Sequence, residues 1–307
     1  MGFKHLLSQI KYEVTKWYYF KKSNTLINKA ISDGVCYIGP FVGEFGHLLS
    51  HIVPFVGYLH SKGVKIKYMG PSIHRTFFVD SDGNPTVSEY NELRDFYSEI
   101  TPNCNDLNLP DDVREVVNRF IRRAKKSDAC YFDLSRKNYY WFGICLYMFE
   151  SRKFKIYPRK FNKGRQNQVV LFARKKGDHS NVRGDNWDFQ QLVDEIIDKT
   201  TLNIVILGHP AFSHSIESNN RVEVKLTSDN SLILEECAKS KFIINQLSGT
   251  HYLGLYTNTE VLLLLKGRNV NFSNYLKDLR YRLLLDPDSS MFVIKSKTEL
   301  LSKLSMK

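Results

Sequence analysis

Short apolar runs alternate with helix-like segments through the second half of the chain, and this alternation constrains the fold more than any other feature. The runs are enriched in Val, Ile, Leu and Phe, as in strands that are buried on both faces. Strands are expected at Gln168–Ala173, Asn203–Leu207, Val222–Leu226, Phe242–Asn245 and Glu260–Leu265, and helices at Asp185–Thr200, Leu232–Lys239 and Gly249–Tyr256. Strands that alternate with helices of this length predict a parallel sheet covered by helices, which is a Rossmann-like domain.

The first half opens with the same order of elements. A strand at Gly34–Ile38 leads into the glycine-rich turn Gly39–Gly46, a helix at His47–His60 and a strand at Val64–Met69. This order predicts a second Rossmann-like domain. Further along, the pattern predicts a turn at Asp80–Pro85 and helices at Tyr90–Glu99, Asp111–Lys125 and Lys297–Ser305.

The predicted fold class is therefore α/β, with two Rossmann-like domains that face each other across a cleft. The length of 307 residues suits two domains. A basic stretch near the middle of the chain contains Pro158 and Gly164 and no acidic residue, and is typical of a linker. We expect domains at 1–157 and 158–307.

Positive charge dominates the chain. Forty-four Lys and Arg against 32 Asp and Glu give a net charge of +12, which predicts an anionic partner. Between Met1 and Ala30, six lysines accompany one acid and a helical repeat of apolar residues. Such a basic helix suits an anionic membrane surface, and the alternative is that it packs on its own domain.

Several classes of protein are disfavoured. No apolar run approaches the roughly 20 residues of a membrane span, so we expect a cytoplasmic protein, either free or peripheral on the cytoplasmic membrane face. The five cysteines are scattered and form no C-x-x-C pair, so neither a metal site nor a disulfide framework is expected. Nucleic acid is disfavoured as a partner, because the chain has no recognised nucleic-acid-binding motif.

Three loops carry residues suited to chemistry. In the glycine-rich turn, Gly43 and Gly46 permit close approach of a ligand, Glu44 is a candidate general base and His47 could assist it. Alternatively, Glu44 caps the following helix and the histidine packs. After the first strand of the second half, the cations Arg174, Lys176 and Arg183 are suited to binding a diphosphate.

The third loop joins a strand to a helix start. Its candidates are Ser248, Gly249 and Thr250, whose backbone N–H groups could bind a phosphate, with ordinary helix capping as the alternative. His209 follows another strand and is a candidate for contact with a sugar or nucleoside.

Together these loops resemble those of GT-B glycosyltransferases, and most of all the heptosyltransferase-type branch with its G-E-F-G-loop relatives. The matching residues are Gly43–Gly46, a tryptophan-led helix at Trp187–Ile196, a strand and glycine at Ile204–Gly208, and Leu247–His251. The resemblance implies transfer of a sugar from a nucleotide-diphosphate donor to a glycan or lipid-linked acceptor, with no cofactor and no metal. It spans about Gly34–His60 and Gln168–Leu265, and no match is found at Ile73–Phe161.

Two other functions remain open at this point. A polysaccharide pyruvyltransferase can share the two-domain architecture, with phosphoenolpyruvate in place of the nucleotide-sugar. The second is a non-enzymatic protein that binds membranes or nucleic acid, in which the two domains act as a scaffold.

Overall fold

Two parallel sheets form the framework of the protein. The computed structural model describes residues 3–99, 109–134, 161, 164–175, 187–246, 248–264 and 291–305. The first sheet has the order β3-β2-β1-β4 and the second the order β10-β9-β8-β5-β6-β7, and every strand pair in both is parallel. The strands are β1 (Val35–Ile38), β2 (Lys65–Pro71), β3 (Glu89–Leu93), β4 (Cys130–Phe132), β5 (Gln168–Phe172), β6 (Asn203–Gly208), β7 (Val222–Leu226), β8 (Phe242–Gln246), β9 (Glu260–Leu264) and β10 (Met291–Ile294).

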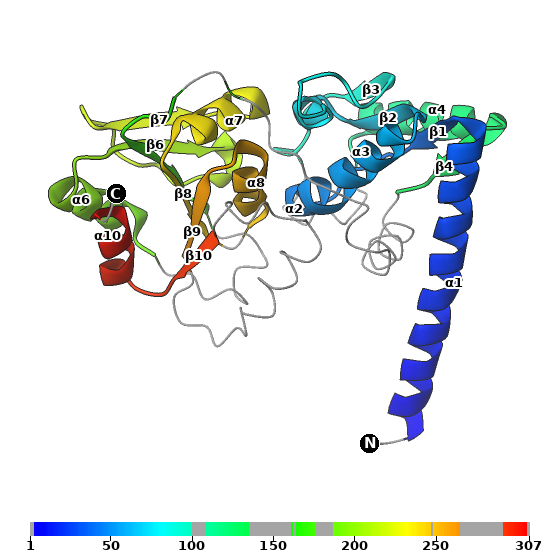
Figure 1. Ribbon diagram of the computed structural model, residues 1–307, viewed down its shortest axis with the longest axis horizontal. Coiled ribbons are helices and arrows are strands. Elements are labelled where there is room, and N and C mark those ends of the chain that lie inside the picture. Colours follow the sequence, from blue (N-terminus) through cyan, green and yellow to red (C-terminus); the bar gives the residue numbers. More distant parts are fainter. Residues whose placement is uncertain are drawn as a thin grey trace.

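Helices cover both sheets (Figure 1). The first sheet is accompanied by α1 (Phe3–Asp33), α2 (Phe45–His47), the π-helical turn η1 (Leu48–Ile52), α3 (Val53–Ser61), η2 (Ser72–Phe77) and α4 (Asp111–Lys126). The second is accompanied by α6 (Phe189–Lys199), η4 (Pro210–Phe212), α7 (Asn230–Lys239), η5 (Gly249–Tyr252), α8 (Leu253–Thr257) and α10 (Lys297–Ser305). The predicted class, α/β with two Rossmann-like domains, is confirmed.

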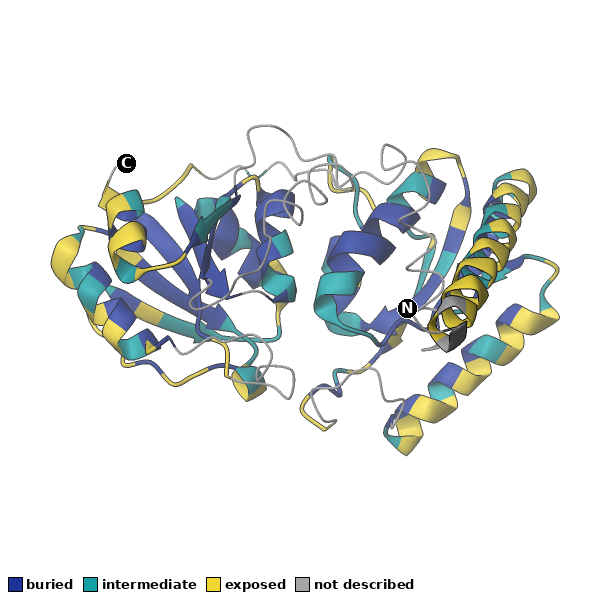
Figure 2. Cartoon of the chain, turned by 90° about the horizontal axis from the view of Figure 1, so that it is seen from below, coloured by how far each residue is buried: buried dark blue, intermediate teal, exposed yellow. Residues whose placement is uncertain are grey.

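The strand residues pack in layers on alternate sides of each sheet. In β5, Val169 and Leu171 belong to a cluster with α6 and α10, whereas Val170 and Phe172 face the opposite way. The cluster on that opposite side continues into the first domain, and Figure 2 shows the buried strands of both sheets. A third cluster packs the outer face of the first sheet against α4.

One predicted helix is wrong. The sequence favoured a helix at Tyr90–Glu99, but Glu89–Leu93 is strand β3, paired with β2. The Tyr90 hydroxyl donates to the carbonyl oxygen of Pro71 at 2.8 Å, and the ring lies 5.3 Å from that of Tyr68. Pairing with a neighbouring strand has outweighed a local apolar spacing that suits a helix. Strands β4 and β10 were not predicted either.

Most other elements fall where the sequence places them, including the turn at Asp80–Pro85, where the Asp80 carboxylate accepts from the backbone N–H groups of Asp82 and Asn84. Helix α6 begins later than expected, with Asp188 as its N-cap accepting from the Gln191 N–H at 3.0 Å. The predicted boundary between residues 157 and 158 lies outside the described residues and stays a prediction.

Helix α1 confirms the predicted N-terminal helix and runs away from the body of the protein (Figure 1). Its C-terminal part is anchored by the buried residues Ile27 and Ala30, and the Lys29 ammonium donates to the Asp128 carbonyl oxygen at 3.2 Å. Within the described part of the chain, no helix combines the length and the apolarity needed to traverse a bilayer.

Candidate functional site

The predicted loops lie at the points where each sheet reverses its strand order. In the first sheet, β1 lies between β2 and β4, and in the second, β5 lies between β6 and β8. In each sheet, the chain first adds strands on one side of the starting strand, β1 or β5, and then adds strands on its other side. At such switch points, the loops after the strands' carboxyl ends diverge and leave room for a ligand. The loops after β1, β5 and β8 are the three that the sequence singled out.

Two of these loops meet, one from each sheet. Gly46, at the start of α2, lies against Gly249, at the start of η5. A Cβ on Gly249 would stand 2.3 Å from the backbone nitrogen of Gly46, a distance that no side chain tolerates. The Tyr256 hydroxyl donates to the Leu49 carbonyl oxygen at 2.6 Å just beyond this contact. A glycine predicted for close approach of a ligand and a glycine predicted for phosphate binding thus bring the two halves of the chain together.

Glu44 begins helix α2 without capping it through its side chain. Its backbone carbonyl oxygen accepts from the N–H groups of His47 at 3.0 Å and Leu48 at 3.1 Å. The carboxylate makes no capping hydrogen bond, and the residue is partly exposed. The capping alternative is therefore absent for this side chain.

His47 lies next to this carboxylate and stacks on His51, with ring centroids 5.4 Å apart and planes 14° from parallel. Burial lowers the pKa of His47, and the nearby Glu44 carboxylate, which raises it, offsets this in part. The imidazole is consequently neutral near pH 7.

The loop after β8 is held by its own polar side chains. The hydroxyls of Ser248 and Thr250 lie 2.7 Å apart, and the Asn245 amide donates to the Thr250 hydroxyl at 3.1 Å. Ser248 makes no side-chain cap to η5, so the capping alternative fails here as well. Asn245 is fully buried, and its side-chain oxygen has no hydrogen-bond partner among the described residues. Asn245 was not predicted as a site residue, although it is the penultimate residue of β8, whose following loop was predicted.

His209 makes a second contact between the two halves of the chain. Its Nδ1 accepts from the Ala211 N–H at 3.2 Å, so its Nε2 carries the proton and donates to the Asp95 carboxylate at 3.4 Å. Both side chains are partly exposed, with 21% and 28% of their surfaces accessible. Asp95 escaped prediction because it follows the strand that the sequence analysis took for a helix.

The cation loop is described in part. Arg174 lies two residues after the end of β5, is exposed, and its backbone forms an isolated bridge with Ser213. Lys176 and Arg183 lie outside the described residues. Arg174 therefore stands at the predicted edge of the sheet, next to the switch point.

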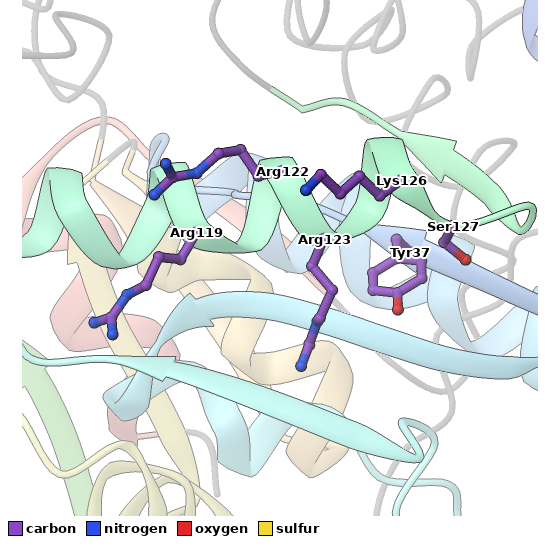
Figure 3. A pocket seen from close by; sticks show the side chains of 6 residues that line it. All are labelled: Tyr37, Arg119, Arg122, Arg123, Lys126 and Ser127. Atoms are coloured by element: carbon purple, nitrogen blue, oxygen red, sulfur yellow. The ribbon is translucent and has the colours of Figure 1, made fainter.

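A basic pocket that the sequence analysis did not predict lies along α4 (Figure 3). It has a volume of about 550 Å³ and is lined by Tyr37, Arg119, Arg122, Arg123, Lys126 and Ser127. Arg123 is already paired with Glu89 at 2.6 Å and with Asn91 at 2.8 Å. None of the predicted site residues that the structure describes lines this pocket, so it is separate from their loops at the switch points. The helical spacing of its cations in the sequence could have revealed it.

No family model and no curated protein matches the chain. Among solved structures, it is similar to Escherichia coli heptosyltransferase WaaC bound to ADP-2-deoxy-2-fluoro heptose, with 9% identity over 88% of this chain and 95% of that one and a TM-score of 0.49. It is also similar to E. coli ADP-heptose LPS heptosyltransferase II, with 12% identity, coverage of 89% and 97% and a TM-score of 0.46. A glycosyl transferase of family 9 from Veillonella parvula shows 11% identity, coverage of 89% and 88% and a TM-score of 0.43.

Proposed function

We propose that the protein is a glycosyltransferase that moves a sugar from a nucleotide-diphosphate donor to a hydroxyl group of a glycan or lipid-linked acceptor. The observation that carries this proposal is the contact between Gly46 and Gly249. It brings the loop that carries a candidate base next to the loop that carries candidate phosphate ligands. Sugar transfer requires both kinds of group in one place. The motifs that resemble heptosyltransferase-type enzymes occupy these same loops.

The two halves of the chain would divide the substrates between them. Residues 158–307 would hold the donor, and residues 1–157 the acceptor and the base. Arg174 and the backbone N–H groups at Ser248, Gly249 and Thr250 would bind the diphosphate, with Lys176 and Arg183 as further cations. His209 would contact the sugar or the nucleoside.

The reaction needs one group to take a proton and others to stabilise a leaving group. The acceptor oxygen attacks the anomeric carbon and forms the new glycosidic bond, while the bond from that carbon to the diphosphate oxygen breaks. Glu44 would receive the hydroxyl proton, with His47 as the second candidate base. The bond's electron pair departs with the nucleoside diphosphate, whose developing negative charge the Arg174 guanidinium would stabilise.

The lowered pKa of His47 supports this arrangement, because it keeps the partly buried imidazole beside Glu44 in the neutral form that a general base requires. The unmade capping bond of Glu44 supports it further, since the carboxylate is not committed to the helix.

Binding of nucleoside diphosphates tests the proposal. The full chain is titrated calorimetrically with adenosine, uridine, guanosine and cytidine diphosphates, and in parallel with phosphoenolpyruvate. Saturable binding of one nucleoside diphosphate is expected. Binding of phosphoenolpyruvate instead would identify a pyruvyltransferase, and binding of none of these would contradict an enzyme of either kind.

A further inference from the structure

Helix α1 carries an apolar stripe that its own domain does not cover. Side chains of the stripe are between 49% and 62% exposed: Leu7, Ile10, Val14, Trp17 and Tyr18. At about 100° of rotation per residue, these five positions fall within an arc of roughly 100° on one side of the helix. An exposed apolar surface of this kind is uncommon on a protein that needs no partner there.

The same helix packs on its domain through the opposite side. Ser23, Ile27 and Ala30 are buried, and their positions lie roughly 180° around the helix axis from the centre of the stripe. Because a straight helix cannot present both sides to one surface, anchoring the C-terminal part turns the stripe outward. Figure 2 shows the resulting exposure along the N-terminal part of α1.

The charges beside the stripe select its partner. Lysines 11, 21 and 22 lie within or at one edge of the stripe, and Glu13 is the single acid between residues 3 and 22. The Lys21 ammonium lies 5.5 Å from the centre of the Trp17 ring. Long lysine side chains can keep their stems on apolar surface while the ammonium reaches outward to a phosphate.

We propose that α1 is a membrane-docking helix, which lays its apolar stripe among the headgroups of an anionic bilayer. Exposed Trp and Tyr are typical of that interface, and the lysines match the negative surface. A second copy of the chain is a poorer partner, because two such helices would bring their lysines together with one acid each to compensate. The inference rests on exposure and charge, and it holds whatever reaction the two domains perform.

Cosedimentation with vesicles tests the inference on the full chain. One set of vesicles is phosphatidylcholine alone, and the other contains phosphatidylglycerol as well. Binding is expected to the second set and to weaken with salt. An apolar variant, Ile10→Ser with Val14→Ser and Trp17→Ser, should bind at least tenfold more weakly. These side chains are exposed, so the fold should persist.

A charge variant provides an independent measurement. Lys11→Gln with Lys21→Gln and Lys22→Gln should also lower affinity at least tenfold. The matched control, Lys65→Gln with Lys125→Gln and Lys199→Gln, removes the same charge elsewhere and should bind like the unaltered protein. The inference is overturned by absent vesicle binding, by equal loss in the control, or by a dimer that the apolar variant converts to a monomer without any vesicle binding.

Discussion

Gly249 lies so close to Gly46 that a Cβ at position 249 would stand 2.3 Å from the Gly46 nitrogen and 2.8 Å from its Cα. The neighbours of the missing Cβ are backbone atoms of the other half of the chain, which cannot rotate away as a side chain would. The contact therefore sets how near the loop after β1 comes to the loop after β8.

Replacing Gly249 with Ala should force these two loops apart. Overpacking of this kind typically costs about 1–3 kcal/mol, and we expect Gly249→Ala to lose that much free energy of unfolding in a urea titration. Gly57→Ala is the matched control, because a Cβ there meets nothing within 4 Å. Equal stability of the two variants would show that the contact is not fixed.

Changing Glu44 to Gln should abolish its ability to accept a proton while keeping its size. We expect kcat to fall by about 10²–10⁴ with donor affinity nearly constant. Stability should not change, because the carboxylate makes no capping bond. Glu115→Gln, at an exposed position on α4, is the control. If Glu44→Gln retains full kcat, His47 becomes the candidate base.

Arg174→Ala should weaken binding of the nucleoside diphosphate by roughly 1–3 kcal/mol, the value of a lost charge-assisted hydrogen bond. Calorimetry measures it directly. Lys199→Ala removes the same charge from an exposed position at the end of α6 and should leave the affinity unchanged. An unaltered affinity in Arg174→Ala, with the fold intact, would remove this residue from the site.

His74 should make the protein less stable in acid. It is fully buried between the rings of Phe45 and Tyr97, and its Nδ1 has no hydrogen-bond partner within the described chain. Burial lowers its pKa to about 3, against a smaller raising effect of Asp95. The unfolded chain protonates the His74 imidazole near pH 6.5, whereas the folded protein keeps it neutral until the pH is near 3. Above pH 6.5 the imidazole is neutral in both states and costs no stability. As the pH falls from 6.5 toward 3, the free energy of unfolding decreases by up to about 1.4 kcal/mol per pH unit.

The variant His74→Phe tests this relationship, because it keeps an aromatic ring and removes the titrating group. Its free energy of unfolding should rise relative to that of the unaltered protein as the pH falls from 7 to 4. Parallel pH profiles for the two proteins would contradict the prediction.

The sequence alone was sufficient to predict most of the strands and the three loops, since these depend on local patterns. Strand β7 and helix α10 were predicted to the residue, because each is a compact apolar pattern between clear breaks. Strands β3 and β4 were missed because neither shows a compact apolar pattern between clear breaks. Glu89–Leu93 contains two glutamates and an asparagine, and it is a strand because β2 pairs with it.

The contacts within the site depend on tertiary structure, and the sequence could predict them less well. The sequence indicated that Gly46 allows close approach of a ligand and that Gly249 could bind a phosphate, but it gave no sign that these two residues, about 200 positions apart, lie against each other. The partnership of His209 with Asp95 was likewise invisible, because it joins loops of different sheets.

The apolar cluster shared by the two halves of the chain has a consequence for how the protein comes apart. Ile38 and Leu49 on one side, and Val170 and Leu253 on the other, belong to one continuous set of buried side chains. Neither half can lose its structure without exposing apolar surface of the other. We therefore expect one cooperative heat-absorption peak in calorimetry, in place of the two successive melting events of independently folding modules.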